Sequence, residues 1–161
     1  MKAPGESPIV FLSYRSSIDH YAAALLDKEL STVLGQDTVF LASRRLKEAD
    51  LNYPEKLLGA VRASKVLLAL IGRGWNTVTD DTGVRLLYRP NDWVRLEIAT
   101  ALEHGISVIP IVLRGAGTEV PVDLPLSLRN MSGLRPLRFY NRNTVEEIDA
   151  IVQEITARRI K

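Results

Sequence analysis

Glu97 is the residue whose type and setting are best suited to chemistry. It follows Trp93 by four residues, so the two side chains lie on the same side of a helix predicted near residues 92–102. The inward stripe of that helix consists of Val94, Ile98, Ala101 and Leu102. Glu97 borders this stripe, and a carboxylate pressed against apolar neighbours is a candidate functional group. Such a site has a single carboxylate available for catalysis.

An ordinary structural role for the same residues stays open. On the helical pattern alone, Glu97 is a partly exposed side chain at the edge of the stripe, and Trp93 belongs to the core. The position of Glu97 in the chain favours the functional interpretation. It falls in the second turn of a helix entered from the strand predicted at 66–71, so it can face the ligand crevice of an α/β sheet.

Other familiar kinds of site are missing from the sequence. The absence of cysteine excludes disulfides, thiolate catalysis and a cysteine zinc cluster, and it favours a cytoplasmic location. His20 and His104 are too few for an all-histidine metal site, so we expect no metal. There is no Walker-type glycine loop and no Gly-x-Ser-x-Gly elbow. Gly72-x-Gly74 lacks the third glycine of the dinucleotide-binding motif, because position 77 is Thr.

The composition is that of one globular domain. The chain has 161 residues, of which 46% are hydrophobic, 25% charged and 6% aromatic. The formal net charge is +2 and its signs are interspersed, which argues against a nucleic-acid footprint. The longest apolar runs, 66–71 and 106–113, are too short to span a bilayer. We expect a polar tail at 1–8 and a single domain at 9–159, with no direct binding to nucleic acid or membrane.

Alternating strands and helices are predicted to position Glu97. The apolar runs predict five strands, at 9–14, 38–41, 66–71, 106–113 and 137–139. The capping and stop signals predict helices from Asp19 to Gly35, from Pro54 to about Ala63, from Asn91-Asp92 to His104, and from Thr144 onward. Pro110 predicts that the fourth strand is irregular or lies at an edge. A long loop is expected over residues 72–91, because this stretch has no periodicity.

This alternation predicts a flavodoxin-like α/β fold. Parallel βαβ units with right-handed crossovers give a three-layer sandwich, in which a five-stranded parallel sheet carries helices on both faces. The ligand crevice of such a sheet lies beyond the carboxyl ends of its strands. The loops to watch are therefore 15–18, 42–53 and 72–91.

Three segments of the chain resemble a Toll/interleukin-1 receptor (TIR) domain. They are Phe11-Leu12-Ser13-Tyr14-Arg15 followed by Asp19, then Asp92-Trp93-x-x-x-Glu97-Ile98-x-Thr100-Ala101-Leu102, and Val108-Ile109-Pro110-Ile111. The resemblance covers nearly the whole chain. Its Trp-x-x-x-Glu block is similar to the catalytic segment of TIR domains that cleave NAD, among them bacterial defence effectors and the animal axon-degeneration enzyme.

The resemblance implies cleavage of the bond between nicotinamide and ribose in NAD+, with Glu97 as the catalytic carboxylate. The products would be nicotinamide and ADP-ribose or a cyclic ADP-ribose isomer, and transfer of ADP-ribose to another acceptor is a variant of the same chemistry. NAD+ is then the substrate, and no cofactor is expected. The alternative, from another class, is a non-enzymatic TIR module that signals by pairing with other TIR domains and needs no carboxylate at position 97.

The resemblance also implies contacts to the rest of the nucleotide. In family members the loop that corresponds to Tyr14, Arg15 and Ser16 lines the nucleotide site. Arg15 is the candidate for a pyrophosphate or ribose contact, and a solvated surface arginine is the alternative. Trp93 would wall the nicotinamide ribose. Core packing is the alternative for Trp93.

The family's BB loop corresponds to about residues 42–53 and is expected to gate the site and to pack against a neighbouring TIR domain. Tyr53 would stack on a ring of the nucleotide, and Trp75 is a candidate of the same kind, with core packing as the alternative for both. Arg44 is a candidate for the nucleotide or for acidic residues of another protomer, and a solvated charged loop is the alternative. Ala42 and Ala49 stand roughly where the family's enzymes often carry aspartate and glycine.

Self-association is the mode of activation that the resemblance implies. We expect a homo-oligomer or filament in the active state and a role as a bacterial anti-phage effector. Family members usually join the TIR domain to a sensor. Because the five predicted βα units take up this chain, we expect the sensor to be another domain or a partner protein outside it.

Overall fold

The computed structural model describes residues 9–42 and 52–160, with the last two as backbone only. The expected tail at 1–8 lies outside these ranges. Positions 43–51, which include Arg44 and most of the expected BB loop, also lie outside them. The fold of the described residues is built around one sheet.

Five parallel strands form this sheet in the order β2-β1-β3-β4-β5. They are β1 (Val10–Ser13), β2 (Val39–Phe40), β3 (Val66–Ile71), β4 (Ser107–Leu113) and β5 (Leu137–Phe139). The chain places β2 on one side of β1 and the later strands on the other, so the strand order reverses between β1 and β3. The predicted flavodoxin-like α/β fold is confirmed.

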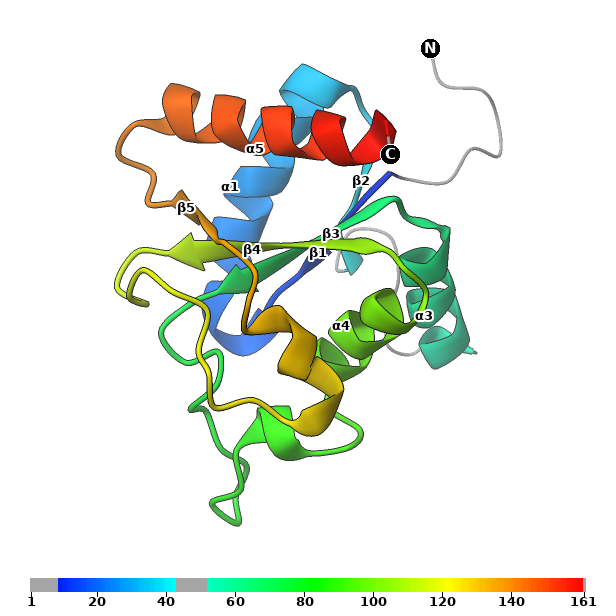
Figure 1. The fold of residues 1–161 in the computed structure, drawn as a ribbon, viewed down its shortest axis with the longest axis vertical. Coiled ribbons are helices and arrows are strands. Elements are labelled where there is room, and N and C mark those ends of the chain that lie inside the picture. Colours follow the sequence, from blue (N-terminus) through cyan, green and yellow to red (C-terminus); the bar gives the residue numbers. More distant parts are fainter. Residues whose placement is uncertain (1–8, 43–51, 161) are drawn as a thin grey trace.

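Helices cover both faces of the sheet (Figure 1). On one face lie α1 (Ser16–Leu34) and α5 (Thr144–Ile160), and on the other lie α3 (Tyr53–Ala63) and α4 (Trp93–Glu103). Two 3₁₀ helices, η1 (Leu86–Tyr88) and η2 (Leu126–Met131), contact α4. The predicted three layers are therefore present.

The central strand β3 shows how the sequence forms two cores. All six of its residues are buried. Side chains alternate between the faces of a strand. Val66, Leu68 and Leu70 therefore pack under α1 and α5, whereas Leu67, Ala69 and Ile71 pack under α3 and α4. A strand covered on both faces needs the continuous apolar run that the sequence has.

The start of α1 differs from the prediction. Asp19 does not cap the helix, which begins at Ser16, and Asp19 lies within it at a non-helical φ of −110° and ψ of 19°. Its carboxylate occupies the space that a β-carbon on Gly72 would take, and Ile18 does the same at Gly74. The two glycines after β3 thus permit close packing of α1, which is the reason for their spacing.

Pro110 lies in a central strand, so of the two predicted settings, an irregular strand or an edge-lying one, the edge-lying one is wrong. β4 pairs with β3 on one side and β5 on the other. β5 pairs only with Ile111 to Leu113, so Pro110 precedes the part of β4 that has two partner strands. A residue without an N–H is tolerated there because one side of the strand is unpaired at that point.

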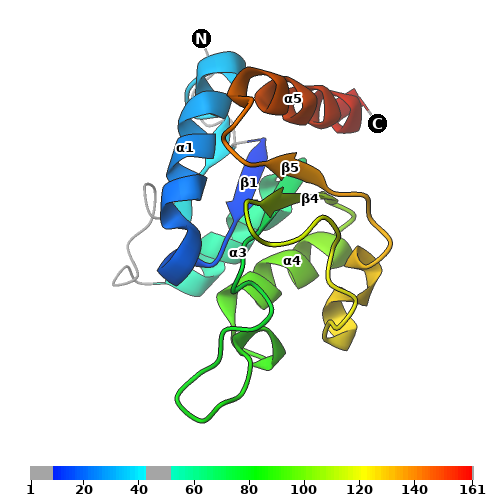
Figure 2. The same cartoon turned by 90° about the vertical axis from the view of Figure 1, so that its left-hand side faces the viewer.

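The carboxyl ends of β1, β3 and β4 lie at one edge of the sheet, and the long loop after β3 leaves from that edge (Figure 2). The loop extends away from the sheet in both views. Within it the structure places η1 and an isolated bridge between Thr79 and Arg85. The predicted long loop at 72–91 is confirmed, and it contacts the start of α4.

Candidate active site

Glu97 lies beneath the point at which the strand order reverses. It is in the second turn of α4, and its side chain is directed to the end of β1, where the Ser13 hydroxyl donates a hydrogen bond to Glu97 Oε1 at 2.8 Å. Glu97 is 7% exposed and Ser13 is fully buried. The alternative interpretation, in which Glu97 is a partly exposed side chain with an ordinary structural role, is therefore wrong. The carboxylate is buried at the carboxyl end of β1.

A buried ion pair lies next to this carboxylate. Arg15 directly follows β1, and its Nη1 donates to Asp92 Oδ1 at 2.5 Å, with both side chains 6–7% exposed. Arg15 Nη2 also donates to the backbone carbonyl of Trp75 at 3.3 Å. Asp92 caps α4, as predicted, by accepting a hydrogen bond from the backbone N–H of Arg95. The pair joins the loop after β1 to the start of α4.

Burial dominates the electrostatics of Glu97. Loss of solvation raises its pKa to about 8, and the negative charge of Asp92 adds to the rise. The hydrogen bond from Ser13 and the positive charge of Arg15 oppose it. With this pKa, Glu97 is mostly protonated at neutral pH. Burial also raises the pKa of Asp19, and Arg15 again opposes the shift.

Trp93 and Tyr53 meet beside the turn that carries Glu97. Their rings are 5.5 Å apart between centroids and nearly perpendicular, at 78°. Both side chains are half-buried, so each keeps surface that a ligand can reach. Tyr53 is the first residue of α3 and Trp93 the first residue of α4. Two helix starts thus place an aromatic pair one turn before the carboxylate.

The other predicted contacts have different settings. Trp75 is fully buried in the core under α3 and α4, so core packing, the alternative interpretation, describes it. Arg15 is 5% exposed and paired with Asp92, so the alternative of a solvated surface arginine is wrong. Tyr14 is half-buried and packs against the core under α1 and α5, and Ser16 is exposed at the start of α1. Arg44 lies outside the described residues.

Sequence reasoning overlooked Ser13 as a partner of Glu97. The signal was present, because a small polar residue ends an otherwise apolar buried strand. Asp92 was recognised as a cap, but its pairing with Arg15 joins residues 77 apart and has no local signature. Within residues 9–42 and 52–160, no group of three or more histidine, cysteine, aspartate or glutamate side chains is arranged to hold a metal ion.

Comparisons with solved structures place this architecture in a known fold. The TIR domains of the activated Roq1 resistosome, which directly recognises the pathogen effector XopQ, superpose with a TM-score of 0.65 over 92% of this chain and 99% of theirs, at 14% identity. The chain is a TIR-fold domain. No protein-family model matches it.

Two further solved structures share the fold of this TIR-fold domain. A TIR-STING receptor from C. gigas, in complex with 2′,3′-cGAMP, has a TM-score of 0.56 and 20% identity, with coverage of 90% of this chain and 42% of the receptor. A prokaryotic SEFIR domain has a TM-score of 0.52 and 18% identity, with coverage of 92% of both chains. At these identities the likeness concerns the fold.

The relatives that are similar in sequence to this TIR-fold domain include an NAD(+) hydrolase. The NAD(+) hydrolase SARM1 of Danio rerio is 28% identical over 147 residues, which cover 89% of this chain. The chain spans about a fifth of that relative, 19% of its length. Among the described residues, no helix of the TIR-fold domain has both the length and the apolar character needed to cross a membrane.

Proposed function

We propose that this TIR-fold domain is an NAD+ nucleosidase and that Glu97 is its catalytic carboxylate. The observation that supports this most is the buried carboxylate of Glu97 at the switch point of the sheet, next to the Tyr53–Trp93 pair. The sequence similarity to an NAD(+) hydrolase supports the choice of substrate. The products are nicotinamide and ADP-ribose or a cyclic isomer of ADP-ribose.

One carboxylate is enough for this reaction. An ordinary glycosidase needs a second carboxyl group to protonate its leaving alkoxide. Nicotinamide leaves NAD+ as a neutral molecule, because the pyridinium already carries the positive charge, so no acid is needed. An anion about 4 Å from the developing ribosyl cation, at an effective dielectric near 20, contributes about 4 kcal/mol, or about a thousandfold in rate.

The substrate itself would ionise Glu97. The raised pKa of about 8 belongs to the protein without ligand. A nicotinamide cation within about 4–6 Å of the carboxyl group lowers its pKa by about 1–3 units, since an opposite charge favours the ionised form. Binding of NAD+ thus converts a stable neutral acid into the anion that catalysis needs. The reduced cofactor NADH carries no such charge and would bind without this effect.

The Glu97→Gln variant tests the assignment, because glutamine keeps the shape and removes the charge. We expect nicotinamide release from NAD+ to fall about a thousandfold. The matched control is Glu103→Gln, in which the carboxylate is exposed at the end of the same helix and activity should be unchanged. Normal turnover by folded Glu97→Gln protein would refute the role of Glu97.

Self-association is the proposed mode of activation. We expect the turnover per molecule to rise steeply when the protein is crowded or clustered, whereas turnover strictly proportional to concentration would contradict this. Absence of NAD+ cleavage under all clustering conditions would favour the non-enzymatic signalling module. A sensor outside this chain, a cytoplasmic location and a role in bacterial defence against phage are parts of the same proposal and rest on the resemblance.

A further inference from the structure

A cavity opens at the carboxyl ends of β4 and β5, on the side of α1 and α5. It has a volume of about 350 Å³ and lies between the first turns of α1 and the ends of β4 and β5. Its apolar wall includes Ala22, Leu25, Leu113 and Phe139. Its polar groups are Asp19, Tyr21, Arg114, Tyr140 and Asn141. A pocket of this size accepts a ligand about as large as a nucleoside.

Two arginines without acidic partners lie at or near this cavity: Arg114 lines it, and Arg73 contacts Gly115, the next residue of the same loop. Arg114 lines it and uses one N–H to donate to the backbone carbonyl of Tyr140 at 2.5 Å, which leaves the rest of its guanidinium open. The guanidinium of Arg73, from the loop after β3, occupies the space that a β-carbon on Gly115 would take. Among the described residues, neither arginine has a carboxylate at ion-pair distance.

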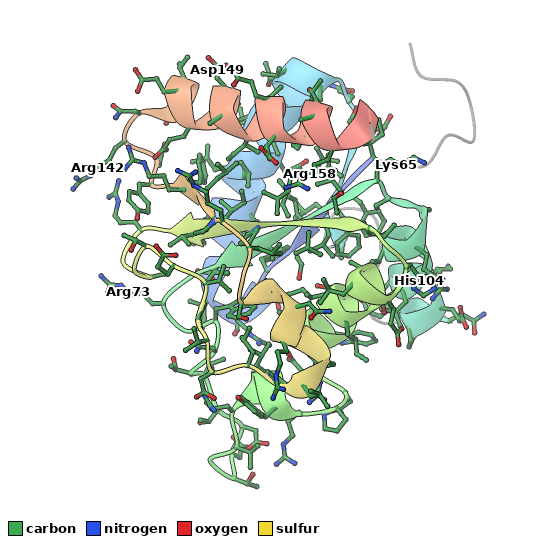
Figure 3. The ribbon with its side chains drawn as sticks, viewed as in Figure 1. Lys65, Arg73, His104, Arg142, Asp149 and Arg158 are labelled. Atoms are coloured by element: carbon green, nitrogen blue, oxygen red, sulfur yellow. The ribbon has the colours of Figure 1, made fainter. Side chains whose placement is uncertain are left out.

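Three loops hold these arginines in place. Besides the bond from Arg114, the Tyr140 hydroxyl donates to the backbone carbonyl of Gly117 at 3.2 Å. Arg138 lies 5.6 Å above the Tyr140 ring. The loops after β4 and β5 are therefore bonded to each other, and Arg73 from the loop after β3 packs against Gly115. Figure 3 shows Arg73 on the side of the molecule where β4 ends, opposite Lys65 and His104.

The lining matches the parts of a nucleoside diphosphate. Guanidinium groups bind phosphate oxygens with planar, charge-assisted hydrogen bonds. Tyr21, which is 80% exposed, and the half-buried Tyr140 offer ring faces for a base. Asp19 and Asn141 offer hydrogen-bonding groups for a ribose. Inorganic phosphate would leave the aromatic and apolar part of the cavity unused.

We propose that this cavity binds a nucleoside diphosphate, with Arg73 and Arg114 on its phosphates. Arg15, the residue expected to hold the pyrophosphate, is buried against Asp92 and has little surface for it. Asp19 lines the cavity and lies one helical turn after Arg15, so the cavity adjoins the Glu97 site. The ligand is either the ADP half of NAD+, an identification that rests on the proposed function, or a separate nucleotide.

Binding of ADP to the wild-type protein tests the proposal, because ADP has no nicotinamide and is not a substrate. We expect calorimetry to show binding that weakens about tenfold or more in the Arg73→Ala/Arg114→Ala double variant. The matched control is Arg62→Ala, an exposed arginine on α3 that does not line the cavity, and it should bind ADP like the wild type. Absence of ADP binding at millimolar concentrations, or equal binding by a folded double variant, would overturn the proposal.

Competition in the Glu97→Gln protein identifies the source of the diphosphate. If NAD+ displaces ADP and nicotinamide mononucleotide, which lacks the adenylate, does not, the cavity holds the ADP half of the substrate. If NAD+ and ADP bind independently, the cavity serves a separate nucleotide. Neither measurement needs turnover, so the cavity can be supported even when the proposed nucleosidase activity fails, and the reverse also holds.

Discussion

Two polar clusters flank the start of α4, and they use similar residue types in opposite surroundings. The buried cluster consists of Ser13, Arg15, Asp92 and Glu97. None of these residues is more than 7% exposed; for Asp92 the value refers to its side chain. The loop cluster consists of Asp80, Arg85, Tyr88, Arg89 and Asp123 and lies at the surface. Arg89 donates to Asp80 at 2.6 Å, and Asp123 accepts from Arg85 at 2.8 Å and from Tyr88 at 2.7 Å.

The difference between the clusters lies in solvation. In the loop cluster, hydrogen bonds to the ionised carboxylates lower the pKa of Asp80 and of Asp123. In the buried cluster, desolvation outweighs the hydrogen bond from Ser13, and the pKa of Glu97 is raised. The loop cluster therefore holds the 72–91 loop in place, whereas the buried cluster holds Glu97 as a neutral acid at neutral pH. Each of the following experiments changes one side of this comparison.

Removal of Arg15 should have the largest effect on stability. Arg15→Ala leaves Asp92 buried without its cation and takes a positive charge away from Glu97, and breaking a buried pair from one side costs about 3–5 kcal/mol. Arg89→Ala, which breaks an exposed pair of the loop cluster, is the matched control and should change the free energy of unfolding much less. Urea denaturation of both variants measures this. Equal losses would mean that burial does not distinguish the clusters.

The difference in stability between the Glu97→Gln variant and the wild type should depend on pH, in a direction set by the raised pKa of Glu97. The folded state binds the Glu97 proton more tightly than the unfolded state, so the contribution of Glu97 is fully present below pH 4.5 and is lost as the pH rises through about 8. Glutamine is uncharged at every pH, so the variant does not bear the cost of burying an ionised carboxylate. We expect the variant to be more stable than the wild type by about 3–5 kcal/mol above pH 8, with the difference vanishing near pH 4.5.

Thermal denaturation of both proteins between pH 4.5 and 9 measures that difference. A variant that is less stable than the wild type throughout this range would mean that Glu97 is ionised and well compensated in the free protein. The substrate would then not be needed to ionise it.

The pH dependence of NAD+ cleavage should show the same acid in two states. The profile of kcat/KM reports the free protein and should rise with pH up to about 8, because the ionised fraction of Glu97 grows. The profile of kcat reports the bound state and should rise about 1–3 units lower, because the nicotinamide cation favours the anion. Identical midpoints in the two profiles would contradict ionisation by the substrate.

Ser13→Ala sharpens this experiment. The hydrogen bond from Ser13 favours the ionised carboxylate of Glu97. Its loss should shift the midpoint of the kcat/KM profile to higher pH by about one unit. Ser64→Ala is the control, since Ser64 is equally buried and its hydroxyl donates to the backbone carbonyl of Ala60 at 2.7 Å, away from Glu97. Ser13→Thr keeps the hydroxyl and should restore the profile. A shift in the control would point to general loosening of the fold.

The parts of this molecule that sequence could predict are those with a local cause. The six apolar residues of β3 predict a strand covered on both faces, and the side chain of Asp92 predicts the start of α4. The place of Glu97 followed from the helix period and the topology of the sheet. The pairing of Arg15 with Asp92 and the contact of Asp19 with Gly72 join distant segments, so no local pattern announces them.

The role of Pro110 illustrates the same limit. Its presence within β4 correctly indicated an irregularity in the pairing, but the sequence alone did not reveal that a three-residue β5 would cover only the second half of the strand. The length of the neighbouring strand decides whether a missing N–H matters. A proline, which is typical of edge strands, therefore lies in a central strand here, because tertiary packing decides which strands pair.

Asp80→Asn, in the loop cluster, should have the smallest effect. The lowered pKa of Asp80 means that its ionised form contributes stability above about pH 4, and that this contribution is lost as the pH falls. The group is only partly buried, so solvent and salt screen its interactions with Arg89. We expect a small drop in melting temperature at neutral pH that shrinks in high salt and below pH 4. A loss as large as that of Arg15→Ala, unaffected by salt, would show that the loop is held as rigidly as the core, and the two clusters would then differ in chemistry but not in mechanical role.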